Sequence, residues 1–153
     1  VESVLRAAKI AHEAGVYVIL NPAPACHLPD ELFGYISLIT PNQTESALLS
    51  GVGDNLDAAV EKLMQLGVKD VVVTLGSKGS LVISEGTRTL VPSLKVKAVD
   101  TTAAGDTFCG ALCVALSEGC SLVDAAGFAT KASALTVQKM GAQDSIPFRS
   151  DIK

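Results

Sequence analysis

The chain has 153 residues, of which 48% are hydrophobic and 18% are charged, and its formal net charge is −4. The apolar content excludes a disordered segment, and the slightly negative charge excludes the basic surface typical of nucleic-acid-binding proteins. No apolar run approaches the roughly 18 residues of a membrane-spanning helix, and no signal peptide is visible. We therefore expect one domain over residues 1–153 with a sizeable core.

The first half of the chain alternates helical patterns with short apolar runs. Apolar residues recur at helical spacing from Glu2 to Ala14, and Gly15 would end that helix. Short strands are expected over 16–20 and 36–40, and helices over 29–35, from 45 onward and over 55–66. Pro22 and Pro41 would end the two strands, because proline cannot continue a hydrogen-bond ladder.

The second half begins with a strand over 70–74 and a hairpin, 80–84 and 87–92, around Glu85-Gly86. A further strand is expected over 94–99. Two helices follow, one to about Leu116 and an Ala-rich one over 122–137 that Ser121 would cap. Apolar strands that alternate with helices indicate an α/β fold, with a parallel sheet covered on both faces.

The stretch from Asp100 to Gly110 joins the last expected strand to the helix after it. A strand, a turn of small residues and a helix together aim backbone N–H groups at an anion. Gly105 would let a ligand approach the backbone, and Asp106 would lie in the first helical turn beside that anion. Two readings of Asp106 stay open: a base that removes a proton from an attacking hydroxyl, or a carboxylate that complements the helix dipole.

Two other stretches follow strands directly, where open α/β sheets present ligand-binding groups. Gly76-Ser77-Lys78-Gly79 lacks the spacing of a Walker A loop, and the side chain of Lys78 alone is read as a solvated turn lysine. Asn42 and Glu45 fit a capping box that opens a helix.

The four cysteines are Cys26, Cys109, Cys113 and Cys120. Their spacing matches no standard zinc pattern, and the last three would share one helical face with apolar residues. Packing in the core is therefore preferred over metal binding. The absence of paired spacing and of a secretion signal favours a reducing, cytoplasmic setting.

Five stretches occur in a fixed order: Asn21–Ala25, Thr40–Glu45, Thr74–Gly79, Asp100–Leu112 and Gly141–Pro147. Together they resemble the ribokinase family of sugar kinases, the PfkB-type carbohydrate kinases, over essentially the whole chain. The resemblance implies a ribokinase-like three-layer α/β sandwich with a mostly parallel central sheet. The family's Gly-rich sugar motif is missing and the first residue is Val1. We therefore expect the C-terminal, nucleotide-binding portion, with the N-terminal half and its lid absent.

The resemblance also implies an ATP-dependent phosphotransferase that acts on an alcohol group of a sugar. In ribose-specific members the acceptor is O5 of D-ribose, and the product is ribose 5-phosphate. By the family match Asp106 is the catalytic base, and Ala103, Ala104 and Gly105 build the anion hole with it. Nucleotide contacts are implied for Asn42, Thr74, Leu75, Gly76, Ser77, Lys78, Gly79, Gly105 and Thr130.

Two ions are implied by the same resemblance. A monovalent cation, K⁺, would be held by Asp100, Thr102, Thr136, Lys139, Gly141 and Ser145, several through backbone carbonyls. A turn-capping role for Asp100 stays open beside this one. Glu45 would act on Mg²⁺ through water, which suits an ion that keeps several of its waters. The partners expected for the intact protein are ATP, a small sugar such as ribose and a second copy in a homodimer, with no nucleic acid and no membrane.

Two alternatives stay open. One is another kinase of the same family, such as a fructokinase or a keto-deoxy-sugar kinase, because the sugar is read mainly by the absent half. The other is a non-catalytic nucleotide-binding fragment. The chain by itself is expected to be inactive, and its apolar content favours self-association.

Overall fold

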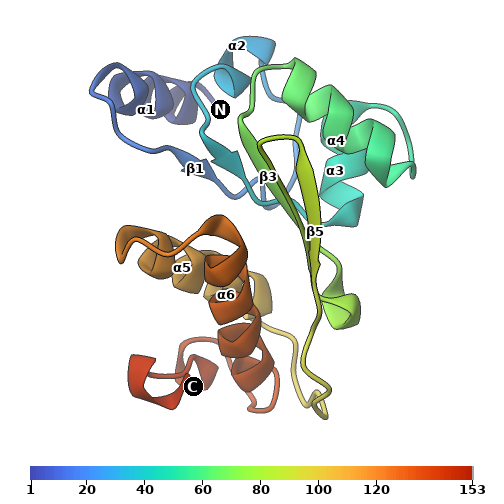
Figure 1. The fold of residues 1–153 in the computed structure, drawn as a ribbon, viewed down its shortest axis with the longest axis vertical. Helices are drawn as coiled ribbons and strands as arrows, with labels where there is room; N and C mark the ends of the chain where they lie inside the picture. The colour runs from blue at the N-terminus through green and yellow to red at the C-terminus, as the bar shows by residue number, and fades with distance from the viewer. Residues whose placement is uncertain (153) are drawn as a thin grey trace. The chain divides into compact units, whose positions relative to one another are not determined.

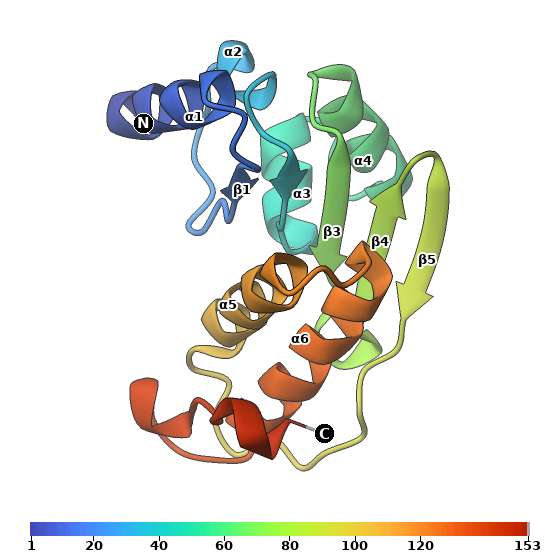
Figure 2. The ribbon, with the colours of Figure 1, turned by 60° about the vertical axis from the view of Figure 1, so that its left-hand side comes forward.

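The computed structural model describes residues 1–152 and has an α/β fold. Within that range five strands form one mixed sheet in the order β1-β2-β3-β4-β5 (Figures 1 and 2). The strands are β1 (Ile19–Leu20), β2 (Leu38–Ile39), β3 (Asp70–Thr74), β4 (Ser80–Ser84) and β5 (Thr87–Val91). β1 pairs with β2 and β2 with β3 in parallel, and the register places Ile39 opposite both Leu20 and Val71.

The described residues divide into two compact units. The first contains Val1–Val73 and Ile83–Thr87, and the second contains Thr74–Val82 and everything described from Arg88 onward. In the first unit the helices are α1 (Glu2–Glu13), α2 (Asp30–Phe33), α3 (Gln43–Ser50) and α4 (Leu56–Gln65). Its core combines buried side chains of helices and strands, namely Leu32, Phe33, Leu38, Ile39, Val60 and Leu63.

The second unit is built on the helix pair α5 (Ala104–Ser117) and α6 (Leu122–Thr136), which lie side by side in both ribbon views. The short 3₁₀ turns η1 (Gly76–Lys78), η2 (Gln143–Ser145) and η3 (Arg149–Asp151) belong to it as well. Alanine dominates the buried positions of α6, at 125, 126, 129, 132 and 134, while Phe108 and Leu112 are buried in α5. Small side chains let the two helices approach closely, so α6 can reach the first turn of α5 with short side chains.

The helix boundaries agree with the sequence analysis to within two residues for α1, α4, α5 and α6. β3 spans the expected residues, and the hairpin of β4 and β5 turns at Glu85-Gly86. The first two strands are shorter than expected. Each contributes two ladder residues, because Val16 and Tyr17 are exposed and Ser37 uses its hydroxyl to accept from the Val18 amide.

Two expectations were wrong. No strand forms over 94–99, where Leu94, Val96 and Val99 are exposed and no neighbouring strand offers a ladder among the described residues. Alternation of apolar and charged residues predicts a strand only where a partner edge exists. The cysteines do not pack in the core either, because Cys109 and Cys113 are half-buried while Cys26 and Cys120 are exposed. α5 ends at Ser117, so Cys120 lies beyond the helical face to which it was assigned.

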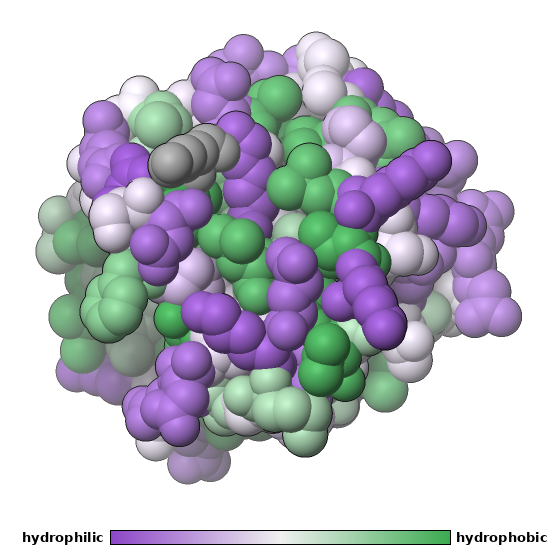
Figure 3. All heavy atoms as spheres, turned by 90° about the horizontal axis from the view of Figure 1, so that it is seen from below, coloured by the Kyte–Doolittle hydropathy of each residue, from purple (hydrophilic) through white to green (hydrophobic). Residues whose placement is uncertain are grey.

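Large apolar side chains are exposed in both units, including Val16 and Ile10 in the first and Met140 and Phe148 in the second. Hydrophobic and hydrophilic residues lie intermingled on the face seen from below (Figure 3). Within residues 1–152, no helix has both the length and the apolar composition needed to cross a bilayer.

Candidate functional site

The first turn of α5 begins from an unusual backbone conformation. Ala103, the N-cap, has φ 60° and ψ 7°, in the left-handed region that L-residues rarely adopt. The Ala104 amide donates to the Thr101 carbonyl at 3.2 Å, and the Thr107 amide makes the first intrahelical bond to Ala103 at 2.8 Å. No side chain among residues 1–152 caps this helix. The amides of Gly105 and Asp106 thus head a helix without a cap, at its positive end.

Asp100 holds the turn that leads into α5. Its Oδ1 accepts from the Thr102 amide at 2.9 Å, and its Oδ2 accepts from the Gly141 amide at 3.0 Å. The carbonyl of Val137 also accepts from the amides of Val99 and Asp100. Hydrogen bonds from Thr102, and next from the Gly141 amide, hold the pKa of the Asp100 carboxyl below its ordinary value of 3.8. The charged carboxylate therefore joins the turn before α5 to the turn after α6.

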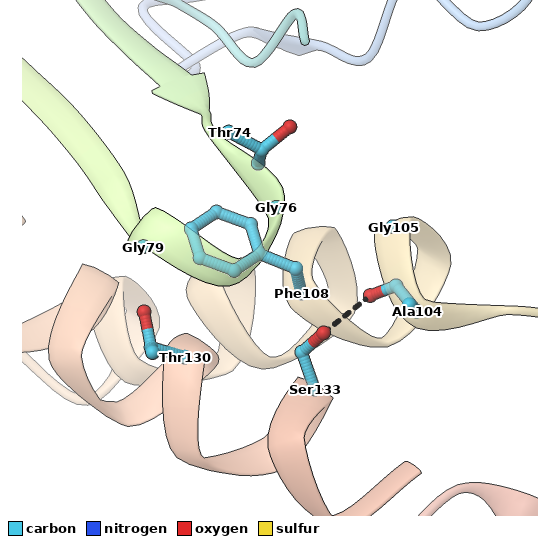
Figure 4. Close-up of a pocket in the computed structure, with 8 residues that line it drawn as sticks. All are labelled: Thr74, Gly76, Gly79, Ala104, Gly105, Phe108, Thr130 and Ser133. Carbon is cyan, nitrogen blue, oxygen red and sulfur yellow. Dashed lines mark hydrogen bonds between the residues drawn. The ribbon is translucent and has the colours of Figure 1, made fainter. Parts of the chain in front are cut away.

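A pocket of about 150 Å³ opens beside the first turn of α5 (Figure 4). It is lined by Thr74, Gly76, Gly79, Ala104, Gly105, Phe108, Thr130 and Ser133, all of which belong to the second unit. Phe108 belongs to α5, and in that view its ring projects over the turn of residues 76–79, called the glycine turn below. The volume of this pocket suits part of a nucleotide, such as a phosphate or a ring edge, and not a whole drug-sized ligand.

The glycine turn that forms one wall depends on Gly79. This residue has φ 105°, and a Cβ built on it would lie 2.0 Å from the Val91 carbonyl oxygen. The glycine turn therefore passes so close to β5 that no side chain fits at this position. A hydrogen bond from the Leu75 amide to the Gly79 carbonyl, at 2.8 Å, closes the turn. Ser77 and Lys78 are exposed and do not line the pocket, nor does Leu75.

Hydroxyl groups of α6 contact the first turn of α5 at two points. Ser133 Oγ donates to the Ala104 carbonyl oxygen at 3.0 Å, as the dashed line in Figure 4 marks. Thr136 Oγ1 lies 3.1 Å from Thr107 Oγ1, and both side chains are buried. The start of α5 is thereby tied to α6 by hydrogen bonds as well as by apolar packing.

Asp106 faces a different cavity from its neighbour Gly105. It is exposed, and it lies at a groove of about 340 Å³ that runs along α5 past Val114 towards Glu118. Arg149 closes the far part of that groove, with a salt bridge to Glu118 at 2.8 Å and its guanidinium 4.2 Å from the Phe128 ring centre. Two successive residues of one helical turn thus line two different cavities.

In the first unit, Asn42 and Glu45 form the expected capping box at the start of α3. The Glu45 amide donates to Asn42 Oδ1 at 2.8 Å, and Glu45 Oε2 accepts from the Asn42 amide at 2.7 Å. Both side chains are engaged with the helix start in this arrangement.

The residues predicted to hold a monovalent cation lie in two neighbouring stretches. Asp100 accepts from the amides of Thr102 and Gly141 as described. The Lys139 amide donates to the Thr136 carbonyl at 3.1 Å, and buried Ser145 donates to the Ala142 carbonyl. Across residues 1–152, His, Cys, Asp and Glu side chains form no cluster of three suited to a metal. Oxygen ligands from backbone carbonyls with one carboxylate are the kind of donor set that a hard cation accepts.

Phe108 and Ser133 line the pocket and were missed by the sequence analysis. The signal that would have found Ser133 is the spacing of Thr130, Ser133 and Thr136, three hydroxyl residues every third position in an Ala-rich helix. Residues three apart share a helix face, and polar groups on an inward face need partners.

Comparison with known proteins places this arrangement in a family. The pfkB family carbohydrate kinase pattern matches residues 1–149. The chain belongs to the pfkB family of carbohydrate kinases.

Three similar proteins illustrate the relationship. A ribokinase of Schizosaccharomyces pombe is 47% identical over 154 residues, which cover 95% of this chain and 48% of that protein. The crystal structure of a Thermotoga maritima ribokinase matches with a TM-score of 0.92 and 44% identity, covering 99% of this chain and 51% of that one. An Arabidopsis thaliana ribokinase complexed with ribose and ATP matches with a TM-score of 0.92, 38% identity and coverage of 97% and 50%. The chain spans about half the length of the relatives it matches.

Proposed function

We propose that this chain forms the nucleotide-binding portion of an ATP-dependent sugar kinase that phosphorylates D-ribose at O5, giving ribose 5-phosphate. The observation that carries the proposal is the uncapped start of α5, where Gly105 lines a pocket together with Gly76 and Gly79 of the glycine turn. The relative solved with ribose and ATP supports the choice of both substrates.

Asp106 is the proposed base. Its carboxylate takes the proton from the sugar hydroxyl, while the hydroxyl oxygen bonds to the γ-phosphorus and the bond from that phosphorus to the bridging oxygen breaks. ADP leaves with the electron pair. The separate groove at Asp106 suits this role, because the attacking sugar oxygen and the leaving oxygen of ADP must lie on opposite sides of the γ-phosphorus.

The first turn of α5 is the proposed anion hole. Negative charge on the γ-phosphoryl oxygens is stabilised by backbone amides that are already oriented, so no reorganisation is needed when the charge develops. Of the four expected members, the amides of Gly105 and Asp106 fit best, because Ala103 is the N-cap and the Ala104 amide already donates to Thr101. The glycine turn and Thr130 would contact the rest of ATP.

Two ions complete the proposal. Mg²⁺ would be reached by Glu45 through water, with Asn42 beside it, and would neutralise phosphate charge. K⁺ would be held by Asp100 with the carbonyls of the turn around Gly141, and would keep the anion-hole turn in place. The oxygen-rich donors fit both hard cations. The intact protein is proposed to be a homodimer.

An ADP-release assay tests the proposed function. The full natural protein that contains these 153 residues should release ADP in the presence of ribose, and the 153-residue chain alone should not. The chain alone lacks the family's sugar-binding motif, and positioning of the two substrates supplies roughly 7–11 kcal/mol of the barrier. Ribose-dependent turnover by the isolated chain would contradict the proposal that this chain binds the nucleotide while another part of the full protein binds the sugar.

Faster turnover with fructose or a keto-deoxy sugar would move the assignment to another member of the family. ATP binding without any sugar turnover by the full protein would favour a non-catalytic nucleotide-binding role.

Salt exchange tests the cation site. Activity should be higher in K⁺ than in Na⁺ buffer, and Asp100→Ala should remove the difference, because its carboxylate orders the turn that carries the anion hole. Equal rates in Na⁺, K⁺ and Cs⁺ for the unaltered protein would refute the cation site and leave the kinase assignment untouched.

A further inference from the structure

Ser133 lies at the pocket in an arrangement that the sugar-kinase assignment does not explain. Its hydroxyl is half-buried, lines the pocket together with Ala104 and Gly105, and donates to the Ala104 carbonyl oxygen at 3.0 Å. The two bonded residues are 29 positions apart in the sequence. This bond is the direct polar link from α6 to the backbone of the proposed anion hole (Figure 4).

The direction of this bond is unusual for a hydroxyl in the middle of a helix. Serine and threonine side chains in helices commonly bond to the carbonyl four residues earlier in the same helix. Thr130 does so with Ala126 at 2.8 Å. Thr136 does so with Ala132 at 3.2 Å, although its hydroxyl also lies 3.1 Å from that of Thr107 in α5. Ser133 lies between them on α6 but directs its hydrogen out of the helix, to the first turn of α5.

The atom that Ser133 contacts determines the consequence. The Ala104 carbonyl and the Gly105 N–H belong to one planar trans peptide group, in which the two point in opposite directions. A donor that holds the carbonyl oxygen therefore also sets the direction of the Gly105 N–H. Donation to the carbonyl in addition polarises the peptide, which strengthens the hydrogen bond that its N–H can give.

The turn needs such a support. Ala103 has a left-handed conformation that is unfavourable for a non-glycine residue, and no side chain among residues 1–152 caps the helix that follows. A strained conformation persists when surrounding contacts over-determine it. Asp100 supports the turn from one side, and Ser133 together with the buried Thr107–Thr136 pair supports it from α6.

We infer that Ser133 is a positioning residue for phosphoryl transfer: its hydroxyl holds the Ala104–Gly105 peptide so that the Gly105 amide points at the transferred phosphate. This inference rests on the proposed function. It assigns Ser133 no contact with the substrate and no role in proton transfer.

Three variants of the full natural protein test it. Ser133→Ala removes the donor, Ser133→Thr keeps a hydroxyl, and Ser117→Ala is the matched control. Ser117 also donates to a helix carbonyl, that of Val114 at 2.7 Å, but at the far end of α5. Loss of a complete oxyanion-hole donor costs about 10²–10³ in kcat, and Ser133→Ala should cost less, about 5- to 20-fold. KM for ATP and for the sugar should stay within about 2-fold, because the donor acts on charge that develops during transfer.

A readout independent of turnover is the amide signal of Gly105 in protein labelled with ¹⁵N-glycine, identified by its loss in Gly105→Ala. The signal should shift in Ser133→Ala and return towards its original position in Ser133→Thr, while Ser117→Ala leaves it in place. An unchanged Gly105 signal, or a fall in kcat that Ser117→Ala reproduces, overturns the inference.

The same experiment separates this inference from the proposed function. Unaltered protein that transfers no phosphate from ATP to a sugar refutes the proposed function, whereas the Gly105 signal still decides whether Ser133 holds the peptide. Full turnover in Ser133→Ala together with a large loss in Asp106→Asn refutes the positioning role alone.

Discussion

Helices α3 and α5 both carry an acidic residue three positions after the N-cap, yet the two helix starts differ. In α3 the cap is Asn42, and the carboxylate of Glu45 turns back to accept from the Asn42 amide at 2.7 Å. In α5 the cap is Ala103, whose methyl group can accept nothing, and no side chain among residues 1–152 caps the helix. The acidic residue at this position completes a capping box in α3, whereas in α5 neither the first amides nor the Asp106 carboxylate takes part in a side-chain cap.

Helix α6 belongs with α3 in this comparison. Ser121 accepts from the Asp124 amide at 3.2 Å and donates to the Asp124 carboxylate at 2.6 Å. An acid that interacts with its own cap contributes to stability. Asp106 has no such cap beside it, so its removal should affect function far more than folding.

The largest expected effect is that of Asp106→Asn in the full natural protein. Sugar phosphorylation should fall by about 10²- to 10⁴-fold, because a general base contributes on that scale. ATP binding should stay within a few fold, measured by calorimetry beside the ADP-release assay. The control is Asp124→Asn, at the same position of α6, which should retain kcat. Near-normal turnover in Asp106→Asn would show that Asp106, like Asp124, only stabilises the start of its helix.

Gly105→Ala separates stability from function. Gly105 has no atom within 4 Å of a Cβ built on it, so alanine fits the fold and should stabilise α5 by up to about 1 kcal/mol. The added methyl group would stand at the pocket beside the amide, and misplacement of the phosphate should lower kcat/KM for ATP by about 10- to 100-fold. The control is Gly127→Ala in α6, also in open space, which should raise the melting temperature without loss of activity. A fully active Gly105→Ala would remove Gly105 from the proposed site.

The caps of α3 and α4 provide a smaller, paired test. Asn55 caps α4 by accepting from the Ala58 amide at 3.1 Å, as Asn42 caps α3. Asn42→Ala and Asn55→Ala should each lower the free energy of unfolding by about 0.5–2 kcal/mol, measured with urea. Activity lost in Asn42→Ala beyond that lost in Asn55→Ala would measure a role of Asn42 in nucleotide binding. Equal activities would leave Asn42 with its capping role alone.

The smallest effect is expected at Asp100, and it should appear in acid. The folded protein holds the pKa of this carboxyl below 3.8, so its charged form stabilises the fold above the ordinary pKa. That contribution should be lost as the pH falls from 3.8 through the lower folded value. Melting temperatures of the unaltered protein and Asp100→Asn should therefore differ near neutral pH and converge in strong acid. A difference that persists at the lowest pH would mean that the lost stability does not come from the charge.

The comparison also shows how far the sequence could predict the site. The starts of α3, α4 and α6 can be predicted from Asn42, Asn55 and Ser121, because capping depends on side chains within three residues of the helix start. The motif from Asp100 to Gly110 likewise predicted the turn and the helix α5. Leu94 to Val99 read as a strand and does not form one, because a ladder requires a neighbouring strand that local alternation cannot reveal.

The amino-acid sequence by itself determined the α/β class, the helix starts and the family, because these depend on local capping, periodicity and ordered motifs. The tertiary structure decided the contacts that join residues far apart in the chain. These include the bonds from Asp100 to Gly141 and from Ser133 to Ala104, and the reach of Gly105 and Asp106 into two cavities. A hydroxyl in an Ala-rich helix can bond within its own helix or across to another, and packing of α6 against α5 selects between the two.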